Sequence, residues 1–449
     1  MKKLAVFLSL LLTFVLFVPY MDFTAQAAGT VYIKSETAVL MDAKTGTVLY
    51  DKNMNRQMHP ASITKIMTGM LALEIADEKE LMTTSHNAVY SLPYNTSHIA
   101  LGEGELITLE QGMYALGIES ANDAANVIAE HISGTTESFA QLMTQKAHSL
   151  GAVNTNFTNP HGLPDDNHYT TAYDMALITR QAIQTEDFNK YFSTNRYDMA
   201  PTNIRDVMRQ FWNANYFING YEECKGLVMS KTGWTEEAKH TMVTVAQRNG
   251  VTLIAVVMAS THKGDKFDDT TALFDYGFEN FAPTVISADY VKENMPLALV
   301  ATDGSSVTVN RTNYLTESID VMLPKSKTQA DVSFKTGSVH FNEARDFATV
   351  DVDVYYNDNG TSRLCGSSTV SLVFAAEEAD EGPALADVMQ KIVLIILVII
   401  LWLVIALLAF VALKQLVILE NRRRIRKKRA AQLEAKRRKQ QADKTVYRK

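Results

Sequence analysis

The spacing of apolar residues is helical over a first stretch of the chain and strand-like over a second. Helical spacing, interrupted by Gly- or Ser-containing breaks, predicts helices over about 62–75, 108–118, 121–132, 137–150 and 171–183. Three strand-type runs follow at 229–233, 240–247 and 251–259, before helical spacing returns at 268–281. Helices, then adjacent strands, then a closing helix predict an α+β domain whose last helix covers an antiparallel sheet.

Further strand patterns flank this block. Residues 35–42 and 47–50 are β-type runs around a Gly-containing turn and predict a hairpin, and Asn249-Gly250 predicts a tight turn between the last two strands of the block. Short strands are predicted at 297–301, 306–309, 319–323, 349–355 and 370–374, of which 349–355 alternates with a period of two. We therefore expect a large domain over 28–283 and a small all-β domain over 284–375.

Two long apolar runs lie outside these domains. Lys2-Lys3, an apolar run over 4–18 and the small residues Ala25-Gln26-Ala27 are typical of a signal peptide spanning 1–27. The second run, 392–413, has 22 residues without a charge, which is long enough for a transmembrane helix. An acidic linker over 376–391 precedes it.

Charge is divided unevenly on the two sides of the second apolar run. Residues 414–449 hold 15 Lys/Arg and 3 Asp/Glu, and because the whole chain is −7, residues 1–413 carry −19. The positive-inside rule then predicts a single-pass protein of the cell membrane, with an extracytoplasmic body and a basic cytoplasmic tail. The acidity of the body argues against nucleic acid as its partner.

The two cysteines, Cys224 and Cys365, are too few for a disulfide framework, and no Cys/His cluster has zinc-like spacing. We expect two free, buried thiols, no metal and no cofactor.

Candidate chemistry begins at the head of the first predicted helix. Ser62 and Lys65 are three residues apart, so that a hydroxyl and an amine share one helix face. A serine hydroxyl becomes a good nucleophile when a neighbouring base takes its proton, and a desolvated lysine can be that base. Alone, Ser-x-x-Lys is a weak signal, because most such lysines are solvated. Ser120-Ala121-Asn122 offers a hydroxyl and a carboxamide from one turn, but both residue types are also common helix caps.

The triplet Lys-Thr-Gly occurs three times, at 44–46, 231–233 and 335–337. The first is the turn of the N-terminal hairpin and the third lies in the predicted all-β domain, and we interpret both as turns. Only Lys231-Thr232-Gly233 begins the strand block. There the edge of a sheet would aim Lys231 and Thr232 at a helix end, and Gly233 would let a substrate backbone approach closely.

These three motifs, in this order, resemble the S-x-x-K, S-x-N and K-T-G set of class A β-lactamases and penicillin-binding proteins. Their flanks are most similar to the D-alanyl-D-alanine carboxypeptidases, the low-molecular-mass penicillin-binding proteins, at 60–68, 119–125 and 159–163. The resemblance covers about 37–281. It implies the penicillin-binding/β-lactamase-like transpeptidase fold, in which an antiparallel sheet is flanked by helices and a helical lobe.

The resemblance also implies catalytic roles. Ser62 would attack the penultimate D-Ala carbonyl of a peptidoglycan stem peptide and form an acyl-enzyme, with Lys65 as the base. Ser120 would pass a proton to the leaving D-Ala. Penicillins and other β-lactam antibiotics would acylate the same serine.

Binding roles follow in the same way. Asn122 would hold the substrate amide, Thr232 the terminal carboxylate, and Lys231 would supply a second positive charge that lowers the pKa of the base. Gly233 would also belong to the substrate-binding set, and the Trp234 backbone N–H would share the oxyanion hole with that of Ser62.

Two positions depart from the family pattern. Lys239 stands where a glycine is expected a few residues after Gly233. The arginine that often assists carboxylate binding after the last strand has no clear counterpart, and Lys263 is the candidate in that region.

Three alternatives stay open. A DD-endopeptidase would use the same residues, whereas a class A β-lactamase-like hydrolase is disfavoured by the small β domain and the anchor. The non-enzymatic alternative is a membrane-anchored penicillin-binding scaffold, which would have no need of all three motifs.

Overall fold

The computed structural model describes residues 31–315 and 317–374, and further along the chain residues 389, 392–402, 405, 427 and 430–435. The predicted signal peptide (1–27) lies outside the described residues, as does the predicted linker (376–391) except for Met389. The chain divides into two units, Met1–Phe374 and Ala375–Lys449.

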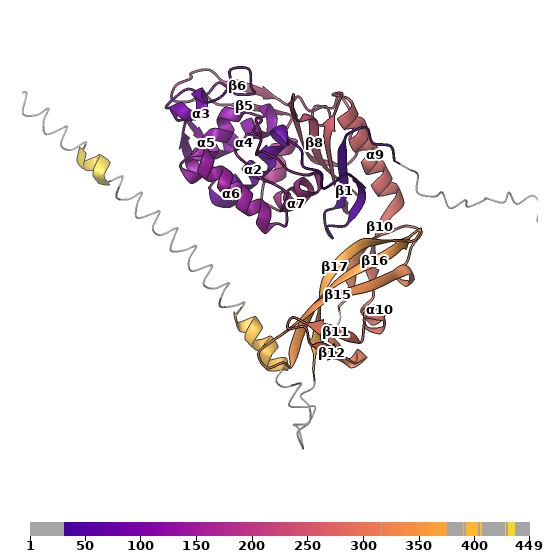
Figure 1. Cartoon of the computed structure of the whole chain (residues 1–449). Coiled ribbons are helices and arrows are strands. Elements are labelled where there is room, and N and C mark those ends of the chain that lie inside the picture. The colour runs from indigo at the N-terminus through magenta and orange to yellow at the C-terminus, as the bar shows by residue number, and fades with distance from the viewer. Residues whose placement is uncertain are drawn as a thin grey trace, which may run out of the picture. The chain divides into compact units, whose positions relative to one another are not determined.

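A five-stranded antiparallel sheet with the strand order β2-β1-β9-β8-β7 forms the centre of the large domain in the first unit (Figure 1). Its strands are β1 (Thr37–Asp42), β2 (Val48–Lys52), β7 (Leu227–Thr235), β8 (Lys239–Arg248) and β9 (Val251–Ser260). The predicted hairpin and the predicted three-strand block therefore belong to one sheet, because β1 pairs with β9. Asn249 and Gly250 have φ of 50° and 80° at the turn between β8 and β9, as the predicted tight turn requires.

The period-two alternation of β1 and β9 separates two apolar layers. Leu40 and Leu253 face a layer that includes Phe274 of helix α9 (Asp265–Asn280). Val39 and Val256 face the opposite layer, which belongs to the helical lobe. The sheet is thus covered on both faces, with α9 on one side and the lobe on the other (Figure 1).

Helix α2 (Lys65–Ile75) is the central helix of the lobe. Residues 65–72 are all buried, as expected of a helix that is surrounded by other elements. The other helical elements of the lobe are η1 (Ala61–Thr64), α3 (His86–Tyr90), α4 (Leu109–Tyr114), η2 (Ala115–Glu119), α5 (Asn122–Ser133), α6 (Thr136–Ser149), α7 (Ala172–Ala182) and α8 (Phe188–Ser193). Two small ribbons complete the lobe, β3 (Leu81–Thr83) with β4 (Leu106–Thr108) and β5 (Arg196–Met199) with β6 (Arg209–Trp212).

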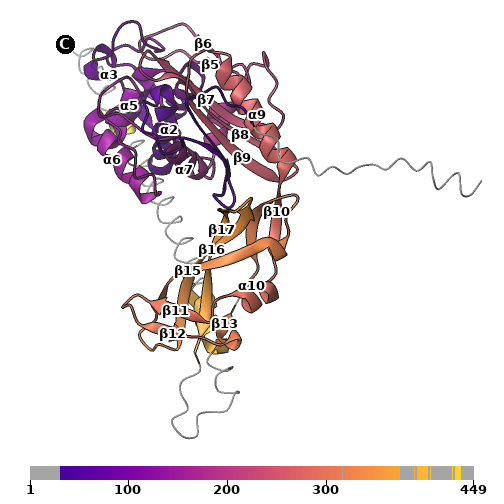
Figure 2. The same cartoon turned by 45° about the vertical axis from the view of Figure 1, so that its right-hand side comes forward.

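After α9 the chain forms strands again (Figure 2). These strands have an apolar core of their own. Strands β10 (Phe281–Ile286) and β14 (Ile319–Pro324) pair with each other. A six-stranded sheet has the order β12-β11-β15-β16-β17-β13. Its strands are β11 (Ala298–Ala301), β12 (Ser306–Thr308), β13 (Tyr314–Leu315), β15 (Val332–Phe341), β16 (Phe347–Asp358) and β17 (Thr361–Val373). A short helix, α10 (Ala288–Asn294), also lies in this segment and was not predicted.

Two expectations from the sequence are corrected here. The third Lys-Thr-Gly triplet lies inside strand β15, at a register shift between Thr336 and Val339, and is not a turn. Both cysteines are free, but only Cys365 is buried, whereas Cys224 is partly exposed.

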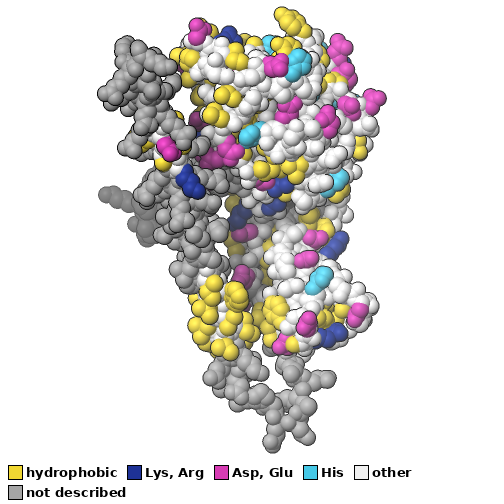
Figure 3. Space-filling model, turned by 90° about the vertical axis from the view of Figure 1, so that its left-hand side faces the viewer, with side chains coloured by type: hydrophobic (Ala, Val, Ile, Leu, Met, Phe, Trp, Pro, Cys, Tyr) yellow, Lys and Arg dark blue, Asp and Glu magenta, His cyan; other side chains and the backbone are white. Residues whose placement is uncertain are grey.

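The described surface mixes residue types. On the face drawn in Figure 3, acidic, basic and apolar side chains are interspersed over much of the described surface, and apolar side chains also gather in a patch. The helical residues 392–402 expose a continuous run of apolar side chains.

The predicted transmembrane span is only partly described. Residues 392–402 and Ile405 are helical, and the rest of the predicted 392–413 span lies outside the described residues. Within the described part of the chain, none of the helices combines the length and the apolar character needed to cross a bilayer.

Candidate active site

Ser62 and Lys65 lie where the 3₁₀ turn η1 runs into helix α2. A 3₁₀ turn has three residues per turn, so side chains at i and i+3 lie one above the other. The Lys65 Nζ atom is 3.0 Å from Ser62 Oγ, and the lysine side chain is fully buried. The pairing predicted from the spacing of the two residues is therefore present.

Three oxygen atoms surround the Lys65 amine. Besides Ser62 Oγ, its Nζ is 2.7 Å from Asn122 Oδ1 and 2.6 Å from the backbone carbonyl oxygen of His161. The amide and carbonyl oxygens can only accept, so they take two N–H bonds from the amine. A neutral amine then has its lone pair left for the hydroxyl of Ser62, which is the arrangement that a base needs.

The electrostatics favour that neutral amine. Burial lowers the pKa of Lys65 well below its ordinary value, and the positive charge of Lys231 lowers this pKa further, while Asp123 opposes both. Both causes expected from the sequence, burial and a nearby cation, are thus present.

Ser120 follows directly after the π-helical turn η2. It has a left-handed backbone, with φ of 55°, and such strained residues are often found at functional sites. Its Oγ accepts a hydrogen bond of 2.9 Å from Lys231 Nζ. The N-cap of α5 is Ala121 and has no side-chain cap bond, so Ser120 and Asn122 are engaged by the two lysines instead of capping the helix.

Lys231, Thr232 and Gly233 lie on β7, an edge strand of the sheet. Lys231 is buried, and burial together with the charge of Lys266 lowers its pKa to about 7. A Cβ on Gly233 would lie 2.8 Å from the Ser62 backbone nitrogen, so the absence of a side chain lets β7 approach the nucleophile closely. The close neighbour found at Gly233 is thus the chain's own backbone, whereas a substrate backbone is expected there from the sequence.

Trp234 and Lys239 flank the turn that follows this strand. The Trp234 side chain is 57% exposed, and its ring centroid lies 6.2 Å from that of His240. Lys239 has φ of 55°, so a lysine adopts the left-handed conformation for which the family uses glycine. The departure from the family pattern leaves the pairing of β7 with β8 intact.

Sequence reasoning missed Lys266, which is buried in the first turn of α9. The helix predicted from the sequence begins at residue 268, which leaves this lysine outside it. Burial and the charge of Lys263 lower the pKa of Lys266 to about 8, and its own charge acts on both Lys231 and His240. Lys263, the candidate from the sequence, instead bonds to the Tyr216 hydroxyl at 2.9 Å.

The loop that carries the His161 carbonyl is held by a second histidine, His168. The Thr158 N–H donates to His168 Nδ1 at 3.0 Å, so Nε2 carries the proton and donates to Thr64 Oγ1 at 2.9 Å. Gly162 has φ of 88°, and a Cβ there would lie 1.9 Å from the Ala61 carbonyl oxygen. Residues 159–163 were expected only to resemble the family, so the contact of their backbone with the Lys65 amine was missed.

Comparison with known proteins identifies the class to which this fold and site belong. A family model described as D-alanyl-D-alanine carboxypeptidase, peptidase S11, matches residues 22–262. The match spans more than half of the chain, and the chain belongs to this family.

Named relatives agree. D-alanyl-D-alanine carboxypeptidase DacF of Bacillus subtilis is 34% identical over 252 residues, which are 55% of this chain and 63% of the relative. DacA of Haemophilus influenzae is 31% identical over 260 residues, 56% of this chain and 63% of the relative. The chain thus spans slightly less than two thirds of these relatives' length. The crystal structure of the carboxypeptidase DacD from Francisella tularensis has the same fold, with a TM-score of 0.58 at 23% identity, over 79% of this chain and 98% of that one.

The buried histidine makes stability depend on pH. Burial lowers the pKa of His168 from 6.5 to about 3, so between these values the unfolded chain binds a proton that the folded chain does not. We expect the free energy of unfolding to be highest above about pH 6.5 and to fall as the pH drops towards 3, by up to about 1.4 kcal/mol per pH unit from this group. His161, whose pKa burial also lowers, adds to the slope with the same sign.

Urea unfolding of the purified protein at several pH values measures this slope. His168→Gln should flatten it, whereas the exposed control His340→Gln should leave it unchanged. An equal slope in wild type and His168→Gln would contradict the assignment.

Proposed function

We propose that this protein is a serine-type D-Ala-D-Ala carboxypeptidase that removes the terminal D-Ala from peptidoglycan stem peptides. The observation that carries the proposal is the buried Lys65 amine, which faces the Ser62 hydroxyl and has two acceptor-only partners. Family membership supplies the substrate class.

Acylation begins when Ser62 Oγ attacks the carbonyl carbon between the two D-Ala residues while its proton passes to Lys65 Nζ. The carbonyl oxygen becomes an oxyanion, and the backbone N–H groups of Ser62 and Trp234 would stabilise it. Such donors are worth about 3–4 kcal/mol each.

Collapse of the tetrahedral intermediate breaks the C–N bond and releases the terminal D-Ala. Its nitrogen takes a proton from Ser120 Oγ, which lies 2.9 Å from Lys231 Nζ and can be reprotonated through the lysines. Water then attacks the ester on Ser62, with Lys65 again accepting a proton, and the free enzyme is restored. A β-lactam would follow the same acylation step, with its ring amide in place of the peptide bond.

Substrate binding divides between two sides of the nucleophile. The Asn122 amide would hold the acyl side of the peptide, while Thr232 and Lys231 would bind the terminal carboxylate. Gly233 and Trp234 would offer the edge of β7 to the peptide backbone.

We further propose that Lys266 assists Lys231 in binding the carboxylate. Within the described residues neither lysine forms an ion pair, although both are buried. Burial and the charge of Lys266 lower the pKa of Lys231, while burial and the charge of Lys263 lower the pKa of Lys266. Two buried cations without a counter-ion suit an anionic ligand, whose arrival would relieve their repulsion. Lys263 is less suited, because it is exposed and engaged by the Tyr216 ring and hydroxyl.

The enzyme would act at the outer face of the cell membrane. The sequence supports a signal peptide over 1–27, a transmembrane helix over 392–413 and a basic cytoplasmic tail over 414–449, with the peptidase domain (28–283) and the small β domain (284–375) outside. This topology would place the site beside its cell-wall substrate.

The nucleophile is tested with the full chain in detergent. Wild type should release D-Ala from a pentapeptide and be labelled by a fluorescent penicillin, and Ser62→Ala should lose both activities, because no other hydroxyl contacts Lys65 in the described residues. A cross-linked dimer, tested in parallel, distinguishes a carboxypeptidase from an endopeptidase. No D-Ala release by wild type, or label on another residue, would reject the proposal.

The carboxylate site is tested with two volume-matched substitutions. Lys266→Met should raise the KM for the pentapeptide about tenfold or more, because a charged hydrogen bond is worth about 1.5–3 kcal/mol. Lys263→Met should change KM less than about twofold. A larger effect of Lys263→Met than of Lys266→Met would reverse the assignment.

The anchor is tested by truncation after Gln390. The full chain should sediment with membranes and resist salt extraction, since a 22-residue apolar helix would hold it. The truncated chain should appear in the soluble fraction with its penicillin labelling retained. Unchanged membrane fractionation after truncation would refute the anchor.

A further inference from the structure

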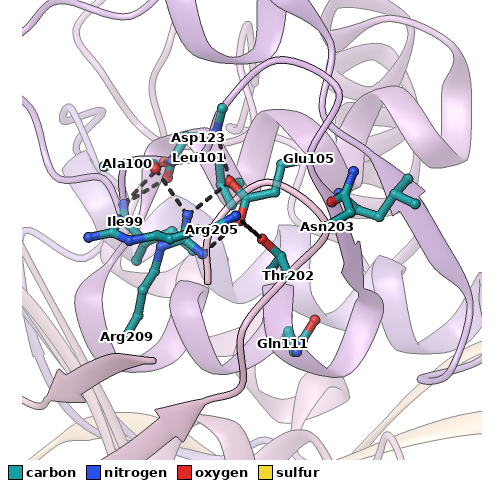
Figure 4. Close-up of polar contacts among 12 residues, drawn as sticks. Ile99, Ala100, Leu101, Glu105, Gln111, Asp123, Thr202, Asn203, Arg205 and Arg209 are labelled. Carbon is teal, nitrogen blue, oxygen red and sulfur yellow. Dashed lines mark hydrogen bonds and ion pairs between the residues drawn. The ribbon is translucent and has the colours of Figure 1, made fainter. Parts of the chain in front are cut away.

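A buried ion pair, Glu105 with Arg209, lies among the residues that the proposed reaction does not use. Their side chains are 1% and 6% exposed, and the contact is bidentate, with Nη1–Oε1 at 2.7 Å and Nη2–Oε2 at 2.9 Å. Figure 4 shows Glu105 between Arg209 and Thr202. The Glu105 carboxylate also accepts from the Thr202 hydroxyl at 2.6 Å and from the Gly102 N–H at 2.8 Å.

Glu105 ends a segment, residues 97–105, that we call the strap. The Asp123 carboxylate accepts from the N–H groups of Ile99 and Leu101, which lie on either side of Ala100 (Figure 4). Ala100 has a left-handed backbone, with φ of 55°, and successive N–H groups around such a residue form an anion-binding concavity. Arg209 Nη2 bonds to the Ala100 carbonyl at 3.1 Å, so the arginine holds both the middle and the end of the strap.

The strap contacts the candidate active site directly. The Asn122 backbone N–H donates to the Ser97 carbonyl at 2.8 Å. Asn122 is the first residue of α5, and its side-chain Oδ1 accepts from the Lys65 amine. The position of the strap therefore sets where this acceptor lies.

Arg209 lies at one end of strand β6. The other end of β6, at Trp212, contacts the residue that precedes Ser120. The Trp212 N–H donates to Glu119 Oε1 at 2.8 Å. Glu119 is the last residue of η2 and precedes Ser120, whose left-handed backbone aims its Oγ at Lys231. The turn 120–122 is thus held by the strap on one side and by β6 on the other.

We propose that Glu105 and Arg209 are positioning residues, whose ion pair joins the strap to β6 and so closes a clamp around the turn 120–122. The clamp keeps the Ser120 hydroxyl against Lys231 and the Asn122 amide oxygen against Lys65. Buried ion pairs contribute little to stability on average, but they can enforce one arrangement of the elements that they join. This inference rests on the proposed function in one respect, the roles of Ser120 and Asn122 in the reaction.

The contact between Glu119 and the Trp212 N–H is exposed, so variants of Glu119 should keep the fold. Glu119→Ala removes the acceptor of the Trp212 N–H, whereas Glu119→Gln retains an oxygen for it. Misplacement of a reacting group by about 1 Å can cost about 10²-fold in rate. We expect the rate constant of acylation by a fluorescent penicillin to fall about threefold or more in Glu119→Ala and to stay within about twofold in Glu119→Gln.

The ion pair itself is tested with the double variant Glu105→Gln/Arg209→Gln, which removes both charges together and leaves neither unpaired in the interior. Its acylation rate constant, determined for the fraction of the enzyme that becomes labelled by the end of the reaction, should fall at least about tenfold. The labelled fraction and the melting temperature report folding, whereas the rate constant of the labelled fraction reports positioning. Arg248→Gln, which breaks a distant arginine–carboxylate pair, is the control and should acylate at the wild-type rate.

Hydrogen exchange gives a readout that does not need an active enzyme. Amides of residues 119–123 should exchange faster in Glu119→Ala and in the double variant than in wild type. Their exchange rates in Arg248→Gln should equal those of wild type. Wild-type rates and wild-type exchange in Glu119→Ala would overturn the clamp even if the double variant fails to fold. A wild-type chain that no penicillin labels would reject the proposed function, while the exchange data would still decide the clamp.

Discussion

The amine of Lys65 is the group on which the rest of the site depends. An amine buried at the head of a central helix loses its hydration, and it persists there only if its N–H groups have partners. Those partners come from two elements far apart in sequence, the start of α5 at Asn122 and the loop at His161. Helix α2, helix α5 and this loop must therefore meet at one point, and much of the helical lobe is arranged around that requirement.

Buried lysines and buried carboxylates lie in different places around this site. Three lysines, Lys65, Lys231 and Lys266, lie buried on the side of the sheet edge, and each of them has its pKa lowered by its surroundings. The buried carboxylates Asp123 and Glu105 lie behind the turn that carries Ser120 and are bound by backbone N–H groups or by arginine. Carboxylates that are satisfied in this way do not neutralise the lysines. The positive charges of Lys231 and Lys266 therefore stay available for an anionic ligand, while Asp123 limits how far the pKa of Lys65, the proposed base, falls.

Local signals in the sequence were sufficient for much of this structure. Asn249-Gly250 predicts its turn because two left-handed residues are a local requirement, and the Ser62–Lys65 pairing follows from their spacing alone. The third Lys-Thr-Gly triplet was misassigned as a turn, since the same three residues fit a strand when Val339 and its neighbours pair with β16. Strands β5 and β6, the strap and Lys266 were missed because only tertiary contacts give them a role. A sequence pattern shows that an element exists more readily than it shows what lies against it.

The pairing of β1 with β9 has a consequence for how the chain reaches its native state. Thr37 lies opposite Met258, so the sheet cannot close until nearly the whole peptidase segment has been synthesised. At about 5–20 residues per second, the β1–β2 hairpin waits roughly ten to forty seconds for its neighbour. During that time an apolar strand edge has no partner, and such edges attract other chains. The hairpin that is synthesised first is thus the last to pair with the rest of the sheet. In the meantime a chaperone, or another copy of the chain, can bind its free edge.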